Sequence, residues 1–549
     1  MKYKFMSMAA AGVLATAFAS GGTALAQSRA DAEAAMAQMG LSGNENITYG
    51  GTEWSQGRYI LTDVVIRIPG DEEDEEENAA EAETGSGGKA PKTPGLDAEM
   101  DVDIDFDEIH VERMIFDALR IGDSQQVTFD GFALDGLSAE EPVEQSSMRI
   151  EHFGVEGPNE AFIADLVRSF SGETEGADSN WDEYRFETFG VEGLQISGDD
   201  GDGLVEIGLE QFSMQNYSDL ELGRMALVGL SVDAPTESGS RAQFRVGEVS
   251  MTGFKTQAYS ELMGALADGE DENAVMAAYY RSAFAPQLDL FDRFEMRDIA
   301  LDAEGVNFVL DNLTGQINRA GSRYVSTVEL DSARLVPDAS QQAGASLATA
   351  LGMLGYENLE FSMAAHSVYD EATGRMQTVG DNYIQLRDGL RIEFEQDFGG
   401  YDEYFAMLPS LAAAMPDDMA DQSAQTDLVT QIMAPIVLHN MTLRLIDMSL
   451  LDRALDAGAA AQGITKDELR VQAGAMLGVG LMTAPPEVPR PLLAQLSTAL
   501  TNFVNQGGSL TVTAAPAEPL SIGTMMERAE AGTFDYNALG LSFTAEAPE

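Results

Sequence analysis

Alternating apolar and polar residues predict β-strands in the first half of the chain. Between Met100 and Phe106, the apolar residues Val102, Ile104 and Phe106 alternate with aspartates. Successive side chains of a strand point to opposite faces, so a period of two marks one buried and one solvated face. The segment is therefore expected to be a half-buried antiparallel strand with an acidic outer face.

Two shorter apolar runs, 59–61 and 64–68, predict a strand pair that ends at a Pro-Gly sequence. Consecutive acidic residues follow at 71–77, and then a stretch rich in Gly, Pro and Ser. Like charges at that density cannot pack together. Residues 70–95 are therefore expected to form an acidic, disordered loop.

A degenerate six-residue unit recurs along the chain, with the order apolar, any, apolar, any, Gly, apolar. Copies begin at Phe132, Phe153, Phe189, Met225, Val249 and Phe294. The copy at Phe294 lacks the glycine. Irregular spacing argues against a fixed-period solenoid or propeller. The unit instead predicts similar amphipathic strands, each bent or bulged where the glycine lies.

Helical periodicity interrupts these strands and dominates the last third of the chain. Helices are predicted at 158–170, 259–284, 343–354, 401–414, 426–434, 450–461, 466–482 and 491–504. Thr465 is a suitable N-cap for the helix that begins at Lys466. Strands between them are predicted at 359–369, 375–378, 382–398, 510–514 and 539–545.

These elements predict an α+β fold with an antiparallel, β-rich first part. A curved sheet is expected for residues 27–335, and a helix-rich α+β part for residues 336–549. Residues 1–26 have the features of a signal peptide and are excluded from the folded part.

The first 26 residues combine a basic start with an apolar run at 5–19 and small residues before a cleavage point. Ala24 and Ala26 occupy the positions that a signal peptidase reads, which makes Gln27 the expected first residue of the mature protein. No later stretch is apolar for the length that a membrane span needs. We expect export to the periplasm, with secretion as the alternative, and no integral membrane span.

The amino-acid composition limits both the chemistry of the chain and the partners that it can bind. The chain has no cysteine, which excludes disulfides, thiolate catalysis and a lipid-bearing amino-terminal cysteine. It carries 31 basic and 92 acidic residues, a net charge of −61. Such a surface repels nucleic acid and anionic lipids. Either a salty habitat or weak binding of divalent cations accounts for the acidity.

No motif indicates catalysis, so no catalytic, cofactor or metal residues are expected. The four histidines lack metal-ligand spacing, and no nucleophile elbow or Walker loop is present. The acidic Gly198–Gly203 segment suits a hairpin turn better than a calcium loop. A carboxylate-based hydrolase remains a remote alternative, because so many acids make chance pairs inevitable.

The C-terminal helices are rich in methionine and leucine. Flexible methionine side chains suit adaptable apolar pockets, although the same residues can simply pack on a sheet. The candidate pocket residues are Met407, Leu411, Met433, Met476 and Met482.

The signal peptide, the recurring Phe-x-Val-x-Gly-Leu strands and the C-terminal segments 492–504, 507–513 and 516–520 resemble those of AsmA-like and YdgA-like β-rich periplasmic envelope proteins of Gram-negative bacteria. The resemblance implies envelope maintenance and handling of lipids or outer-membrane components, and it supplies no catalytic residues. We therefore expect a non-enzymatic envelope protein that holds or passes a lipid. A periplasmic scaffold that binds other envelope proteins is the alternative.

Overall fold

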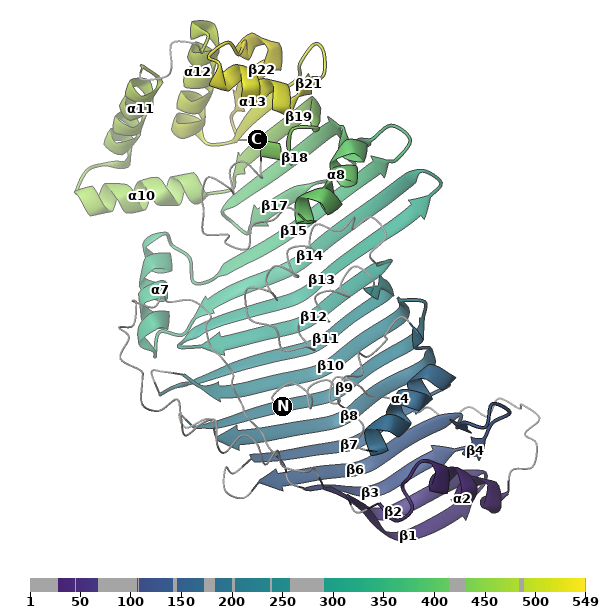
Figure 1. Cartoon of the computed structure of the whole chain (residues 1–549). Coiled ribbons are helices and arrows are strands. Elements are labelled where there is room, and N and C mark those ends of the chain that lie inside the picture. The colour runs from purple at the N-terminus through teal and green to yellow at the C-terminus, as the bar shows by residue number, and fades with distance from the viewer. Residues whose placement is uncertain are drawn as a thin grey trace, which may run out of the picture. The chain divides into compact units, whose positions relative to one another are not determined.

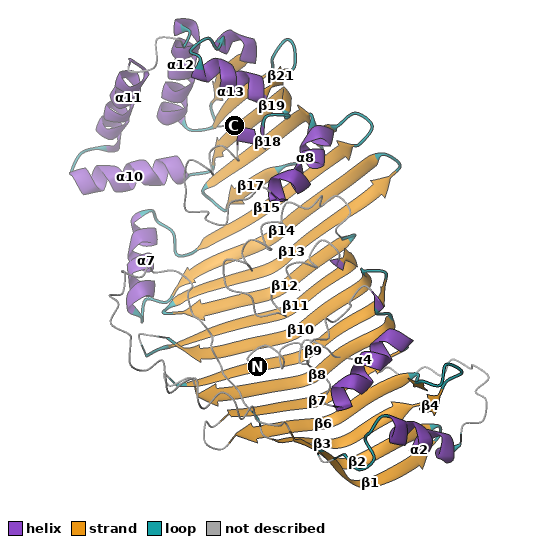
Figure 2. Cartoon of the chain, in the orientation of Figure 1, coloured by secondary structure: helices purple, strands orange, loops and turns teal. Residues whose placement is uncertain are grey.

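The computed structural model describes residues 28–44, 46–67, 106, 108–141, 146–171, 183–199, 203–236, 239–256, 291–413, 430–431, 433–482 and 488–548. The chain divides into two compact units, Met1–Ala242 (unit 1) and Gln243–Glu549 (unit 2). Strands are antiparallel throughout, and helices gather in the C-terminal part, which confirms the expected β-rich α+β class (Figures 1 and 2).

Unit 1 is an up-and-down sheet in which successive long strands pair with each other. Its strands are β1 (Ile47–Ser55), β2 (Arg58–Arg67), β3 (Glu108–Asp117), β6 (Gly131–Glu141), β7 (Ser146–Glu156), β8 (Phe186–Asp199), β9 (Leu204–Ser218) and β10 (Glu221–Pro235). A small hairpin, β4 (Arg120–Ile121) and β5 (Val127–Thr128), contacts the helices α2 (Arg29–Gln38) and α4 (Glu160–Ser171). The pairing of β8 with β9 confirms the predicted hairpin around 198–203.

Long strands of unit 1 shift their buried side partway along their length. In β6, buried apolar residues are two apart from Phe132 to Leu134 but three apart from Leu134 to Leu137. Gly136 supplies the extra residue, with a φ of +65°. Gly193, at the same point in β8, has the same φ. The predicted bend at the glycine of the repeat is therefore confirmed.

Strand pairing places acidic residues and glycines of neighbouring strands side by side, in one row across the sheet. In β3, Glu112 lies between the buried residues Val111 and Met114, and the flanking pairs place it opposite Gly136. We call this row the crease. It contains Gly50, Asp63, Glu112, Gly136, Glu151, Gly193, Glu210 and Gly229, one from each long strand of unit 1.

The predicted strand pair at 59–61 and 64–68 is wrong, because both runs belong to the single strand β2. Asp63 has a φ of +52° and takes the place that glycine has in the repeat. Aspartate tolerates this left-handed conformation better than most residues. The break in alternation that suggested two strands is the crease.

Unit 2 is also built of antiparallel strands, most of which pair with the next strand along the chain. Its strands are β11 (Arg241–Lys255), β12 (Arg293–Ala303), β13 (Val306–Ala320), β14 (Arg323–Pro337), β15 (Leu359–Asp370), β16 (Arg375–Thr378), β17 (Tyr383–Leu386), β18 (Leu390–Gly399), β19 (Val437–Asp447), β20 (Ser509–Ala514), β21 (Leu520–Ser521) and β22 (Leu541–Glu546). The first two residues of β11 fall in unit 1. Asp298 in β12, where the repeat lacks glycine, has a φ of +52°.

Most helices of unit 2 lie at predicted positions, but the helix at Ile522–Glu530 was not predicted. Most of the helix predicted at 426–434 lies outside the described residues, with helical backbone at 430, 431 and 433. The described helices are α7 (Gln342–Met353), α8 (Tyr401–Ala413), α10 (Leu450–Gln462), α11 (Lys466–Met482), α12 (Arg490–Gln506) and α13 (Ile522–Glu530), with a 3-10 turn at Tyr536–Leu539. Thr465 caps α11 as expected: its hydroxyl accepts from the Glu468 N–H at 3.3 Å, and the Glu468 carboxylate accepts from the Thr465 N–H at 2.8 Å. Tyr369 in the sheet packs against Phe405 of α8.

Three predicted elements lie outside the described residues. They are the acidic loop at 70–95, the helix at 259–284 and the strand at 100–106, of which Phe106 alone is described and is buried. The predicted domain boundary near residue 335 differs from the division between the compact units after Ala242. Helices begin soon after 335, but β14 still pairs with β15 across that point. The predicted strand 382–398 is two strands joined by a turn at Asp388.

Candidate functional site

The five predicted pocket residues lie on three separate parts of unit 2. Met407 is half-buried on α8, Met433 precedes β19 and is 37% exposed, and Met476 on α11 is 68% exposed. The backbones of Leu411 in α8 and Met482 in α11 are helical, and their side chains lie outside the described part. None of the five lines either of the hollows described below. A pocket built from them stays a prediction.

The signal-peptide residues Ala24, Ala26 and Gln27 lie outside the described residues. The described chain begins at Ser28, which is the N-cap of α2. Its hydroxyl accepts from the Asp31 N–H, and the Asp31 carboxylate accepts from the Ser28 N–H, which completes a capping box.

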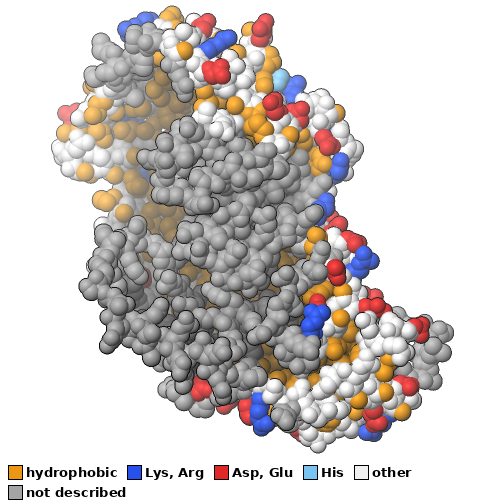
Figure 3. Space-filling view, in the orientation of Figure 1, with side chains coloured by type: hydrophobic (Ala, Val, Ile, Leu, Met, Phe, Trp, Pro, Cys, Tyr) orange, Lys and Arg blue, Asp and Glu red, His pale blue; other side chains and the backbone are white. Residues whose placement is uncertain are grey.

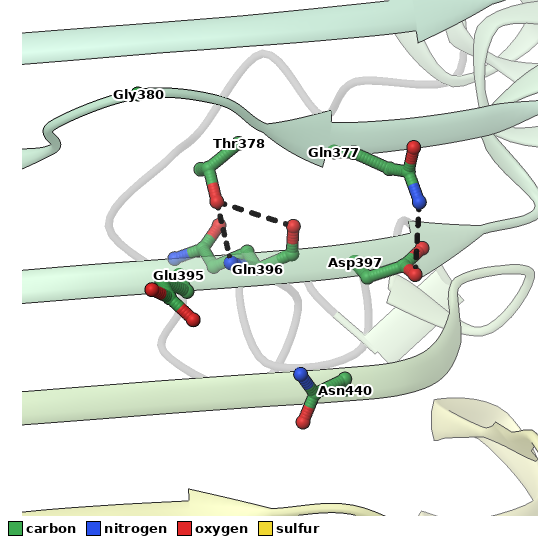
Figure 4. Close-up of a pocket in the computed structure, with 7 residues that line it drawn as sticks. All are labelled: Gln377, Thr378, Gly380, Glu395, Gln396, Asp397 and Asn440. Carbon is green, nitrogen blue, oxygen red and sulfur yellow. Dashed lines mark hydrogen bonds between the residues drawn. The ribbon is translucent and has the colours of Figure 1, made fainter.

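Two hollows flank an interruption between β16 and β17. A hollow of about 310 Å³, the polar hollow, is lined by Gln377, Thr378, Gly380, Glu395, Gln396, Asp397 and Asn440 (Figure 4). A second of about 180 Å³, the apolar hollow, is lined by Ser326, Val328, Ala365, His366, Ser367, Met376, Thr378, Asn382, Phe394, Gln396 and Phe398. Thr378 and Gln396 line both hollows.

Asn382 closes the backbone gap at this interruption. Strand β15 pairs with β17 up to Ala364 and with β16 from Ser367, which leaves Ala365 and His366 between them. The Asn382 side chain accepts from the His366 N–H at 2.6 Å and donates to the Val379 carbonyl at 3.1 Å. Asn382 is only 4% exposed. Its amide therefore replaces strand backbone where two short strands meet.

The polar hollow is held by hydrogen bonds between neighbouring strands. Thr378 Oγ1 accepts from the Gln396 N–H at 2.7 Å, and Gln377 donates to Asp397 at 3.0 Å (Figure 4). Arg375 forms a bidentate pair with Asp397, at 2.9 and 2.6 Å. Burial acts to raise the pKa of Asp397, but these hydrogen bonds and the Arg375 charge outweigh it and lower the pKa. The carboxylate is therefore charged, and both of its oxygens accept hydrogen bonds.

An apolar row crosses the sheet of unit 2 on one face. It consists of cross-strand neighbours, one per strand: Val249, Met296, Leu313, Leu330, Met363, Ile384, Ile392, Leu445 and Leu510. Leu510 is buried, but the others are half-buried or exposed, with Ile384 47% exposed. At a strand spacing of about 4.8 Å, eight steps give a length of about 38 Å.

A second apolar row runs beside the first and is broken at the apolar hollow. On one side it holds Phe294, Gly315, Val328 and Ala365, and on the other Phe394 and Leu443. The two rows together form the apolar band. Hydrophobic side chains also reach the described surface among charged ones (Figure 3).

Two of the histidines contact a carboxylate on a neighbouring strand. His152 Nδ1 lies 2.6 Å from Asp135, and His366 Nε2 lies 3.0 Å from Glu329. Arg113 contacts the same Asp135 from the other side at 2.5 Å. Among the hydrogen bonds of the described residues, neither imidazole joins a serine or threonine hydroxyl. These pairs have the geometry of cross-strand stabilisation.

Acidic residues gather at one end of β3, β7 and β8. Burial, followed by the charges of Asp117 and Glu187, raises the pKa of Glu156. Burial also raises the pKa of Asp117, although the Arg58 guanidinium, 2.6 Å away, acts to lower it. Within the described ranges, no group of three or more His, Cys, Asp or Glu side chains has an arrangement that could hold a metal ion.

Sequence reasoning missed Asn382, the interruption and the crease acids. An Asp-Gly pair at 388–389 signals the hairpin between β17 and β18. A second motif, apolar, any, apolar, acid, any, apolar, marks the crease in strands beside the glycine strands, for example around Glu112 and Glu151. Both signals are present in the sequence.

No helix in the described part of the chain is both long and apolar enough to span a membrane. A family model described as "Uncharacterized protein" matches residues 383–546, which run from the first residue of β17 to the last of β22. No curated protein matches the chain. The family match thus begins directly after the interruption at Asn382.

Proposed function

We propose that this chain is an exported, non-enzymatic envelope protein that holds or passes an apolar ligand, such as a lipid, on the apolar band of unit 2. The observation that carries the proposal is the apolar row from Val249 to Leu510, with Ile384 47% exposed near its middle. Contiguous apolar surface that solvent can partly reach is typical of binding sites. The row is about 38 Å long, which exceeds the roughly 30 Å hydrocarbon thickness of a bilayer, so it has room for an extended acyl chain.

Export follows from the sequence alone, through the basic start, the apolar run and the small residues at Ala24 and Ala26. The absence of a catalytic motif in the sequence supports a non-enzymatic role. His152 and His366 each contact a carboxylate on a neighbouring strand, a geometry that stabilises strand pairing.

The test is native purification from the envelope fraction, followed by mass spectrometry of the organic extract. The proposal predicts stoichiometric lipid and a mature protein that begins at Gln27. Ile384→Asp places a charge in the row and should remove the lipid. Gln385→Asp, on the opposite face of β17, is the matched control and should retain it.

A clean extract from the unaltered protein would overturn lipid binding. If a specific protein co-purifies with that clean extract, the scaffold alternative gains support. Recovery of the uncleaved precursor from the cytoplasm would overturn export.

A further inference from the structure

We propose that the apolar hollow is the headgroup end of the lipid site and that it selects an uncharged, hydroxyl-bearing headgroup. This inference rests on the proposed function. It commits to one occupant: a neutral amphiphile whose acyl chain lies along the apolar band.

The first argument is the change from apolar to polar side chains within one face of the sheet. Val328 and Ala365 are cross-strand neighbours in the second apolar row. Two residues along the same strands, Ser326 pairs with Ser367, which in turn pairs with Thr378. A polar row therefore lies directly beside the band, as an amphiphile requires.

The second argument is the volume of the apolar hollow. The interruption between β16 and β17 leaves a hollow of about 180 Å³ where the second apolar row is broken, between Ala365 and Phe394. A water molecule occupies about 30 Å³ in the liquid, so the hollow has the size of several such groups. Phe394 and Phe398 line it with the serines, so one cavity offers both apolar walls and hydroxyls.

The third argument is charge. His366 is the one titratable side chain among the lining residues of this hollow, and it pairs with Glu329 at 3.0 Å. No lysine or arginine is among the lining residues, so an anionic headgroup would find no cationic partner there, in a chain with a net charge of −61. Hydroxyl groups, by contrast, suit the hydroxyls of Ser326 and Ser367, since both can donate and accept.

The test uses the delipidated, full-length mature protein and native mass spectrometry with three probes: monoolein, oleate and oleoyl-lysophosphatidylglycerol. The neutral monoolein should bind at least about tenfold more tightly than either anion, a difference of about 1.4 kcal/mol. Ala365→Leu fills the hollow and should weaken monoolein binding by about tenfold. Ala300→Leu, a residue whose neighbours Arg245 and Val309 lie on the opposite face, is the matched control and should leave binding unchanged.

Ser367→Ala separates the headgroup contact from the space. It should weaken monoolein binding about threefold to tenfold, the range of one hydrogen bond, and leave oleate binding unchanged. Equal binding of the anions, or unchanged monoolein binding in Ala365→Leu, would overturn the headgroup assignment. If that happens while Ile384→Asp still abolishes binding, the proposed function survives. If no probe binds at all, both fail.

Discussion

A Cβ atom added to Gly136 would stand 2.6 Å from Cγ of Glu112 on the neighbouring strand. Real Cβ atoms do not approach other carbons so closely, so the Glu112 side chain lies in the space that glycine leaves open. The same relationship joins Glu151 to Gly193 and Glu210 to Gly229. The crease of unit 1 is thus a row of glycines covered by carboxylate side chains of adjacent strands.

Gly136→Ala is expected to destabilise unit 1 by about 2–4 kcal/mol. The substitution adds strain at a φ of +65°, which costs about 1–2 kcal/mol, and it also forces Glu112 to move. Urea unfolding followed by circular dichroism measures the loss. Gly57→Ala is the matched control, because Gly57 has a φ of +84° but open space around it.

The double variant Gly136→Ala with Glu112→Ala should recover the part of the loss that comes from the clash. If Gly57→Ala and Gly136→Ala cost the same, the covering of glycine by glutamate contributes nothing, and the crease depends on backbone conformation alone.

Asn382→Ala is expected to destabilise unit 2 by about 2–4 kcal/mol, because it leaves the buried His366 N–H and the Val379 carbonyl without their partner. Hydrogen exchange at the His366 amide should accelerate accordingly. Asn382→Asp keeps the acceptor for His366 but turns a carboxylate oxygen toward the Val379 carbonyl, so it should also destabilise. A variant Asn382→Ala as stable as the parent would show that Asn382 does not close the gap.

Arg375→Gln should raise the pKa of Asp397, because the guanidinium charge and its two hydrogen bonds disappear while burial remains. The lowered pKa of Asp397 stabilises the native state above the unfolded-state pKa of about 3.9 and loses that contribution as pH falls through the native pKa. The variant should therefore unfold at higher pH on acidification. It should also lose about 1–3 kcal/mol at neutral pH.

Carbon-13 NMR of the Asp397 carboxyl and an acid-unfolding titration give the two readouts. Arg387→Gln is the matched control, because its partner Glu360 lies outside both hollows. An unchanged acid midpoint in Arg375→Gln would contradict the prediction.

Glu156→Gln should stabilise unit 1 slightly at neutral pH. Burial and the neighbouring Asp117 and Glu187 raise the native pKa of Glu156, so the charged form is disfavoured in the folded state. The native state then binds the proton more strongly, and stability falls as pH rises from the unfolded to the native pKa. The Glu156 side chain is only partly shielded from water, so solvent screening limits the gain to less than about 1 kcal/mol.

Urea unfolding of Glu156→Gln at pH 7 and below pH 4 checks the sign. The difference from the parent should vanish at the lower pH, where the parent carboxyl is protonated in both states. Added salt should also reduce the difference at pH 7. A variant that is less stable at pH 7 would show that Glu156 makes a favourable ion pair instead.

Local signals predicted most elements of this chain. Helix α11 begins and ends at the predicted residues 466 and 482, and its cap at Thr465 is confirmed. The bends at Gly136 and Gly193 also follow from the repeat. Each of these signals depends on residues within a few positions of one another, so it can be recognised in the sequence without knowledge of the fold.

The sequence by itself therefore determined the β-rich class, the strand repeat and the caps. Only the tertiary structure decided which acids cover which glycines, where Asn382 replaces a strand, and how apolar residues far apart in sequence form one row. Glu112 and Gly136 are 24 positions apart (136 minus 112), and their relationship exists only once β3 and β6 pair in register. The physical reason is that cross-strand contacts depend on pairing, whereas periodicity and capping depend on the local backbone.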